Sequence, residues 1–267
     1  MPLLYPTSNS MDMGQRLLGK LLDSLFSVFS EEFKDKIRYS RLNLLWNIYL
    51  NFRLMCSNVN FYGQNLEDSI LIQYLPETDG SYVDVGAGWP IRGSNSYYFY
   101  KKGWRGVTID PIKQNMFLQK LFRPRDKQIE ALLGDAPGNI DFYIFEPYEY
   151  STSDFKVAQA ILSENKVELK CIKRLEIKRL DSFKLFAKPS DPTLLSIDVE
   201  GKDLEVLTSN DWKNYLPRVI CIETWSDHFE DEKKINSLLQ NVGYRLVAKV
   251  SLSRIYVHNE FIDKSLD

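Results

Sequence analysis

From residue 81 to residue 90 the chain reads SYVDVGAGWP, and this stretch decides the fold. Its first five residues are mostly apolar and β-forming, which is typical of a strand buried in a parallel sheet. Gly86 and Gly88 follow and end the apolar run. Glycine lets the backbone bend sharply and approach a ligand without a Cβ in the way. The stretch therefore predicts a buried strand that ends in a tight turn facing a ligand.

A second apolar stretch, GVTID at residues 106–110, predicts the neighbouring strand and ends in Asp110. Asp110 follows Gly88 by about 20 residues, the spacing at which nucleotide-binding α/β folds place an acid for the ribose. A carboxylate suits this task because it accepts hydrogen bonds from two hydroxyl groups at once. The two stretches together indicate a nucleoside-containing cofactor at the carboxyl ends of adjacent strands.

The residues after the turn argue against a dinucleotide. The dinucleotide fingerprint needs a third glycine where this chain has Ile91. Pro90 precedes it and lacks the N–H group that a pyrophosphate would bind at a helix start. A strand that ends in D-x-G-x-G instead resembles the first motif of S-adenosylmethionine-dependent methyltransferases. In those proteins the turn accommodates the amino-acid part of the cofactor, and the acid after the second strand holds the ribose.

Further motifs sharpen this resemblance. They occur in order between Phe61 and Glu223, and together they are similar to the FkbM family of methyltransferases. The resemblance implies a class I methyltransferase fold, S-adenosylmethionine as the methyl donor and, usually, O-methylation of a hydroxyl group. One departure is Lys202-Asp203, which follows Gly201 where family members often carry other residues. The motifs are YGQNLED at 62–68, YVDVG at 82–86, Ser94-Asn95 with 98–100, KGWRG at 102–106, IDP at 109–111 and LSIDVEG at 195–201.

The order of the predicted elements indicates an α/β fold. Strand-like runs alternate with helical patterns, and two final runs, 244–250 and 253–258, are typical of an antiparallel hairpin. We therefore predict a doubly wound, mostly parallel seven-stranded sheet of the Rossmann-like class I methyltransferase type. A polar helix over residues 155–166 indicates a lid or insertion. The other expected strands cover residues 128–133, 140–144, 169–180, 193–199 and 219–223, and the other expected helices cover 67–75, 97–102 and 230–242.

Residues 1–60 differ from the rest in their pattern of apolar residues, which predicts an N-terminal helical extension. The FkbM-like methyltransferase domain follows at 61–267. Leucine and phenylalanine recur at helical spacing over residues 17–29, and a second helix is expected over 42–54. Two hypotheses remain open: a helical cap on the catalytic domain, or a module that docks on a membrane surface or a partner. No apolar run is long enough to predict a transmembrane segment, and no signal-peptide pattern is present.

The net charge and the cysteines argue against two classes of protein, nucleic-acid-binding proteins and disulfide-stabilised proteins. The formal net charge is −2, so the chain lacks the basic excess that binding a nucleic-acid backbone requires. Cys56, Cys171 and Cys221 form no C-x-x-C pair, and their odd number argues against a disulfide framework. We expect a cytoplasmic protein whose partner is a small-molecule or glycan acceptor. Its oligomeric state stays open.

Several residues near the predicted strand ends are candidates for cofactor binding. Gln64 and Asp68 contact the amino-acid end of the cofactor or the acceptor, or simply cap the following helix. Asn95 likewise caps the next helix or faces the cofactor. Asp135, at the exit of the third strand, accepts from the adenine amino group or lies in a surface turn. The candidates are Gln64, Asp84, Gly86, Gly88, Asn95, Asp110 and Asp135.

Carboxylates at the ends of the later strands are the candidates for catalysis. Ligands of open α/β sheets bind beyond the carboxyl ends of the strands, where Asp198, Glu200 and Glu223 are expected. Methyl transfer to a hydroxyl needs an aligned acceptor and a general base, and a crowded or desolvated carboxylate is a stronger base. We place Asp198 near the reacting methyl and assign Glu200 to acceptor contact or to the base. His228 is an alternative base. Mg²⁺ held by the three carboxylates is a further alternative, although a site without metal is favoured.

The leading functional hypothesis is an S-adenosylmethionine-dependent O-methyltransferase that acts on a hydroxyl of a small molecule or glycan. One alternative is a catalytically idle Rossmann-like binding module, and the acidic and glycine residues retained in the motifs argue against it. The other alternative is a nicotinamide-dependent oxidoreductase, which Pro90 and Ile91 disfavour.

Overall fold

Most of the chain is described by the computed structural model. The contacts group the residues into two compact units, Met1–Asn60 and Phe61–Asp267. In the first unit, helix α3 (Asn43–Met55) stands where the sequence predicts the second N-terminal helix. The predicted helix over residues 17–29 lies largely outside the described residues. The described residues are 17, 21, 24, 27, 28, 30, 43–57, 59–163, 167–224 and 229–264.

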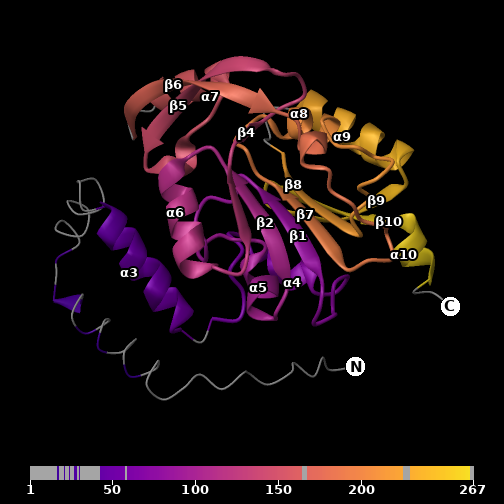
Figure 1. The fold of residues 1–267 in the computed structure, drawn as a ribbon, viewed down its shortest axis with the longest axis horizontal. Coiled ribbons are helices and arrows are strands. Elements are labelled where there is room, and N and C mark those ends of the chain that lie inside the picture. The colour runs from indigo at the N-terminus through magenta and orange to yellow at the C-terminus, as the bar shows by residue number, and fades with distance from the viewer. Residues whose placement is uncertain are drawn as a thin grey trace. The chain divides into compact units, whose positions relative to one another are not determined.

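Among the described residues, seven strands form the main sheet, in the order β3-β2-β1-β7-β8-β10-β9 (Figure 1). The first five strands of this order run parallel, and β9 and β10 form an antiparallel hairpin that joins the sheet through β8. The predicted mostly parallel sheet with an antiparallel edge is therefore confirmed. The strands are β1 (Ser81–Val85), β2 (Arg105–Asp110), β3 (Lys127–Glu130), β7 (Thr193–Ile197), β8 (Val219–Glu223), β9 (Tyr244–Val250) and β10 (Ser253–His258).

Helices lie on both faces of this sheet, because alternate residues of a strand point to opposite faces. Val83 and Val85 of β1 share a core cluster with residues of α8 and α9. Tyr82 and Asp84 face the other side, where Arg123 follows α6 and places its guanidinium 5.1 Å from the centre of the Tyr82 ring. The helices are α4 (Glu67–Leu71), α5 (Tyr97–Lys101), α6 (Lys113–Phe122), α8 (Asp203–Thr208), α9 (Phe229–Asn241) and α10 (Asn259–Lys264).

One predicted strand is divided in the structure into two strands that belong to different sheets. The sequence predicts a single strand over residues 128–133, but the structure divides it into β3 and the short β4 (Leu132–Leu133). At the break, the Ala131 N–H donates to the Asp110 carbonyl at 3.3 Å, after which the chain enters a smaller sheet. The two leucines are buried in different core clusters, so an unbroken apolar pattern conceals the break.

Two predicted helices have different ends in the structure. The helix expected over residues 67–75 ends at Leu71, and hydrogen-bonded turns continue from there to Leu75. The helix expected over residues 155–166 is present as α7 (Phe155–Ser163), and residues 164–166 lie outside the described part of the chain. Neither difference moves a strand of the main sheet.

The predicted lid or insertion is larger than one helix. β5 (Gly138–Glu146) and β6 (Glu168–Lys178) pair antiparallel, and β6 also pairs with β4. The 3₁₀ turn η1 (Tyr148–Tyr150) and α7 lie between the two long strands in sequence. Figure 1 shows β5, β6 and α7 together beyond one end of the main sheet. We call residues 138–178 the insertion. A further 3₁₀ turn, η2 (Leu180–Phe183), leads from it back to β7.

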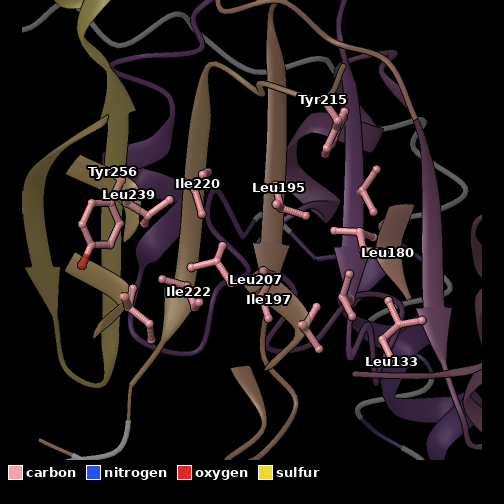
Figure 2. Close-up of a cluster of buried hydrophobic side chains, with 14 of the residues drawn as sticks. Leu133, Leu180, Leu195, Ile197, Leu207, Tyr215, Ile220, Ile222, Leu239 and Tyr256 are labelled. Atoms are coloured by element: carbon pink, nitrogen blue, oxygen red, sulfur yellow. The ribbon is translucent and has the colours of Figure 1, made fainter. Parts of the chain in front are cut away.

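A core cluster of fully buried side chains joins the strands to α8 and α9. Figure 2 shows Leu195 and Ile197 of β7 beside Ile220 and Ile222 of β8, with Leu207 of α8 close by. These central strands are buried on both faces, which explains why they are continuously apolar. The packing of this cluster fixes the strand ends at which the candidate site lies.

Replacing Leu195 by alanine tests this core. Leu195 is fully buried, so the variant leaves a cavity and should lower the free energy of unfolding by about 2–5 kcal/mol. Leu121 on α6 is 49% exposed, and Leu121→Ala should change stability by less than about 0.5 kcal/mol. Urea denaturation of both variants measures the difference. Equal losses would contradict the assignment of the core.

Candidate functional site

The glycine turn after β1 requires the absence of side chains. Gly86 and Gly88 have φ angles of 75° and 45°, in the left-handed region that favours glycine. The N–H groups of Gly86 and Ala87 donate to the Ile109 carbonyl at 2.9 and 3.1 Å, which holds the turn against β2. A Cβ at Gly86 would lie 1.7 Å from the carbonyl oxygen of Asp198. The turn therefore packs directly on the backbone at the end of β7.

Asp110 fixes this turn from the neighbouring strand. Its Oδ2 accepts from the Gly88 N–H at 3.0 Å and from the Asn115 amide at 3.1 Å, and its Oδ1 accepts from the Ile112 N–H at 2.7 Å. Burial raises the pKa of Asp110 to about 6, against the effect of these donors. A carboxylate offers about four acceptor positions, so capacity for a further hydroxyl remains. The structure thus brings together the acid and the glycine turn that the sequence pairs.

Asp84 lies inside a buried polar network. It accepts from the Ser96 hydroxyl, and the Arg123 guanidinium lies 3.9 Å away. Arg123 is fully buried and also pairs with Asp126 at 2.8 Å. Burial raises the pKa of Asp84, and Arg123 opposes that shift. Asp84 and Arg123 together hold the chain at residues 94–96, because Arg123 also donates a hydrogen bond to the Ser94 hydroxyl at 3.3 Å. No motif of the sequence pointed to Arg123.

Asn95 reaches two further strands of the main sheet. Its amide nitrogen donates to the Ser196 hydroxyl of β7 at 3.3 Å and to the Cys221 sulfur of β8 at 3.7 Å. Its Oδ1 is buried and has no hydrogen-bond partner among the described residues. An unpaired buried oxygen is costly unless a ligand supplies a donor. Asn95 is therefore a candidate for contact with a bound N–H group.

The start of α4 and the residues just before it differ from the sequence prediction in which side chains are buried. Gln64 is exposed, whereas Glu67 and Asp68 are buried. Glu67 accepts from the Ser253 hydroxyl of β10 at 3.0 Å, and Asp68 accepts from the Tyr62 N–H at 2.5 Å. Asp68 is the second residue of α4 and binds the preceding segment, so it does not cap the helix as the alternative interpretation expected. Burial raises its pKa to about 6. Glu67 was missed, although it lies within the YGQNLED motif.

Three carboxylates meet at the ends of β7 and β8. Asp198, Glu200 and Glu223 are half-buried, and an oxygen from each lies within 4.8 Å of the others. Glu200 has a φ of 55° and Gly201 a φ of 99°, so the chain turns sharply and does not continue the strand. This turn lets two alternate residues reach one place. Burial raises the pKa of Asp198 and of Glu200 well above the usual range, and the charge of Glu223 adds to the shift of Asp198.

Asp203 holds this turn, which we call the Asp198–Gly201 turn. Its Oδ1 accepts from the Val199 N–H at 3.0 Å, and its Oδ2 accepts from the Gly201 N–H at 3.2 Å. Asp203 is 5% exposed, and burial together with the charge of Asp198 raises its pKa to about 8. The sequence showed Asp203 only as part of a departure from the family pattern. Its position two residues after Gly201 was the available signal.

The insertion contacts the same turn. The Thr152 hydroxyl donates to the Glu200 carbonyl at 2.8 Å, and the Lys202 ammonium lies 3.1 Å from the Asp154 carboxylate. These contacts come from the segment between η1 and α7. The predicted lid or insertion therefore reaches the candidate site through polar side chains.

Of the remaining sequence candidates, the structure places Asp135 on the surface and does not describe His228. Asp135 is exposed in the loop between β4 and β5, and its carbonyl accepts from Arg179. This placement agrees with the surface-turn alternative. His228 lies outside the described residues.

A comparison with protein-family models matches residues 84–246 to the methyltransferase FkbM domain. The chain belongs to the FkbM family of methyltransferases. The match spans the glycine turn, Asp110 and the Asp198–Gly201 turn, and it confirms the resemblance seen in the motifs. The FkbM chain is an S-adenosylmethionine-dependent methyltransferase with the class I fold.

The comparison with curated proteins found no match for the FkbM chain. Among solved structures, a TehB-like SAM-dependent methyltransferase from Corynebacterium glutamicum is 11% identical with a TM-score of 0.41, over 82% of this chain and 100% of that chain. An O-methyltransferase from Bacillus cereus in complex with SAH is 9% identical with a TM-score of 0.38, over 91% of this chain and 96% of that chain. Likeness at this level assigns no activity to the FkbM chain.

The residues around the glycine turn fit the cofactor of this enzyme class. S-adenosylmethionine carries an ammonium group and a ribose diol, which need a hydrogen-bond acceptor each. Asn95 Oδ1 is a buried acceptor without a described partner, and Asp110 keeps acceptor capacity beside Gly88. A Cβ at Gly88 would meet only the Gly86 carbonyl, at 3.7 Å, so the space above that turn is open.

None of the helices in the described residues is long and apolar enough to cross a membrane.

The raised pKa of Asp203 gives a testable pH dependence. An unfolded aspartic acid ionises near pH 4, whereas folded Asp203 keeps its proton up to about pH 8. Between these values the unfolded chain binds fewer protons, so the free energy of unfolding falls as pH rises, by up to about 1.4 kcal/mol per pH unit. Asp203→Asn removes this ionisation, and its stability should fall less steeply between about pH 5 and pH 8. Urea denaturation across that range measures the slopes.

The control for this comparison is Asp211→Asn. Asp211 is on the surface and its hydrogen bonds lower its pKa, so it stays ionised throughout the range and its variant should keep the wild-type slope. If wild type and Asp203→Asn lose stability in parallel, Asp203 is already ionised in the folded protein.

Proposed function

We propose that this FkbM methyltransferase transfers a methyl group to a hydroxyl of a small molecule or glycan. The observation that carries the proposal is the group of Asp198, Glu200 and Glu223, whose oxygens lie within 4.8 Å of one another. The backbone of Asp198 also contacts the glycine turn, where a Cβ at Gly86 would lie 1.7 Å from its carbonyl oxygen. Acid–base groups thus stand next to the turn at which this enzyme class binds its cofactor.

The cofactor-binding residues follow from the same geometry. Asp110 holds the ribose, and Gly86 and Gly88 let the cofactor approach the backbone closely. Asn95 Oδ1 accepts a hydrogen bond from the amino-acid end of the cofactor. When bound, S-adenosylmethionine supplies an electrophilic methyl group on a cationic sulfur. Asp84 acts indirectly, through Ser96 and Arg123.

The carboxylates take the proton that the acceptor hydroxyl must lose. A raised pKa makes a carboxylate a stronger base. Burial raises the pKa of both Asp198 and Glu200, and neighbouring carboxylates add to it, chiefly Glu223 for Asp198 and Asp198 for Glu200. We assign Asp198 to alignment of the acceptor oxygen and Glu200 to acceptor contact or the base, with the proton shared among the carboxylates. Closure of the site by the insertion would exclude water from the reacting groups.

A metal-assisted site is an alternative with which the same geometry is compatible. Three carboxylate oxygens within 4.8 Å of one another are hard ligands of the kind that Mg²⁺ prefers. Mg²⁺ held there would bind the acceptor oxygen and lower the pKa of its hydroxyl. The two mechanisms differ in their response to a chelator, and we favour the site without metal.

Replacing Asp198 by asparagine tests the assignment, because it keeps the size and removes the charge. Methyl transfer from labelled S-adenosylmethionine to acceptors in a fractionated extract should fall by about 100-fold or more. Affinity for S-adenosylhomocysteine, measured by calorimetry, should change little. Glu200→Gln tests the second carboxylate in the same way.

Lys249→Gln provides a control, since Lys249 is exposed and its ammonium pairs with Glu232 and with none of the three carboxylates. Full turnover by an Asp198→Asn, Glu200→Gln double variant would remove both residues from the mechanism. Loss of wild-type activity in chelator, restored by Mg²⁺, would establish the metal alternative instead.

A further inference from the structure

A tryptophan of the glycine turn is bonded to the insertion. Trp89 follows Gly88 directly, and its indole N–H donates to Glu149 Oε2 of η1 at 3.1 Å. Both side chains are half-buried. The two residues lie far apart in the sequence, so this bond joins the cofactor turn to a separate part of the fold.

The same part of the insertion lies over the candidate base. Thr152, three residues after Glu149, donates its hydroxyl to the Glu200 carbonyl at 2.8 Å. The negative charge of Glu149 also contributes to the raised pKa of Glu200, after burial and the charges of Asp198 and Asp203. Trp89 and Glu149 therefore stand beside both the methyl-donor turn and the base, where an acceptor must enter.

These side chains retain free binding capacity. Glu149 Oε1 accepts no hydrogen bond from the described residues, whereas Oε2 is taken by the indole. Arg92 is exposed, and its guanidinium lies 5.4 Å from the centre of the Trp89 ring. The guanidinium lies over one face of the indole, so the three residues bring together the opposite aromatic face, a carboxylate oxygen and a cation.

This combination suits one class of acceptor. The C–H face of a sugar ring is apolar and packs on an aromatic side chain, while its rim of hydroxyls needs donors and acceptors. A simple alcohol would use neither the ring of Trp89 nor two separate polar groups. A phenol would use the ring, but its single hydroxyl must face the base, so none is left for the free oxygen of Glu149.

We propose that Trp89 and Glu149 form the acceptor subsite, and that the acceptor is a polyhydroxylated ring of the sugar class. Trp89 packs on the face of the ring, and Glu149 Oε1 accepts from one hydroxyl. A neighbouring hydroxyl then faces Asp198 and Glu200. This inference rests on the proposed O-methylation and names the acceptor class for the same site.

Two substitutions of Trp89 separate acceptor binding from attachment of the insertion. Trp89→Phe and Trp89→Leu both lose the N–H that bonds Glu149, but only Trp89→Phe keeps an aromatic face. Phe186→Leu is the matched control, because Phe186 is 68% exposed in the segment before β7. Each protein is saturated with S-adenosylhomocysteine, and binding of a panel of methyl hexosides and methyl deoxyhexosides is followed by saturation-transfer NMR and by titration.

We expect at least one glycoside of the panel to bind the wild-type protein. Trp89→Phe should keep its affinity within about threefold, Trp89→Leu should weaken it by tenfold or more, and Phe186→Leu should leave it unchanged. Glu149→Gln keeps an acceptor for the indole but loses the free carboxylate oxygen, and it should also weaken glycoside binding. Affinity for S-adenosylhomocysteine should be the same in all variants.

Three outcomes would overturn the proposal: equal weakening by Trp89→Phe and Trp89→Leu, binding of phenols in preference to glycosides, or no glycoside binding at all. Equal weakening by the two variants would mean that Trp89 only attaches the insertion to the glycine turn. Failure of the proposed function itself has a different signature. In that case glycosides still bind in a Trp89-dependent way, but no hydroxyl of any bound glycoside receives the labelled methyl group.

Discussion

The structure depends on a backbone contact between Gly86 and Asp198. The Asp198 N–H donates to the Val85 carbonyl at 3.0 Å, and the Asp198 carbonyl occupies the space where a Cβ of residue 86 would stand, 1.7 Å away. This contact joins the turn after β1 to the turn after β7 without an intervening side chain. The turn after β1, to which we assign cofactor binding, and the turn after β7, to which we assign acid–base chemistry, are therefore one rigid unit. The parallel pairing of β1 and β7 positions it.

Burial sets the electrostatics of that unit. Among the described residues, no lysine or arginine forms an ion pair with Asp198, Glu200 or Asp203. Burial and the charges of neighbouring carboxylates therefore raise their pKa values. Charged forms of these groups are costly in a partly desolvated place. In the proposed function, the same cost would make them effective proton acceptors for the acceptor hydroxyl. A site that stabilises its carboxylates fully with arginine would be more stable and a weaker base, whereas here the buried Arg123 serves Asp84 and Asp126 instead.

The sequence predicted the parts of the fold that depend on local pattern. Apolar runs ending in Gly86, Asp110 and Asp198 gave the parallel strands and the edge at which they end. The fate of Leu132 and Leu133 was not predictable, since both are apolar and the choice between two sheets depends on tertiary packing. Sequence position also failed at buried polar partners that are distant along the chain, such as the contacts of Arg123 and the bond between Trp89 and Glu149. Within the candidate site, residues on strand ends could be named in advance, whereas residues that the insertion brings in could not.

The most direct measurement of the central claim is cofactor binding by a Gly86→Ala variant. The added Cβ would collide with the Asp198 carbonyl, so the two turns must separate. Gly138→Ala is the control, because a Cβ there would meet nothing within 4 Å. Calorimetric titration with S-adenosylhomocysteine should show affinity reduced by tenfold or more in Gly86→Ala, with methyl transfer lost in parallel, and wild-type affinity in Gly138→Ala. Wild-type affinity and turnover in a folded Gly86→Ala variant would contradict the account.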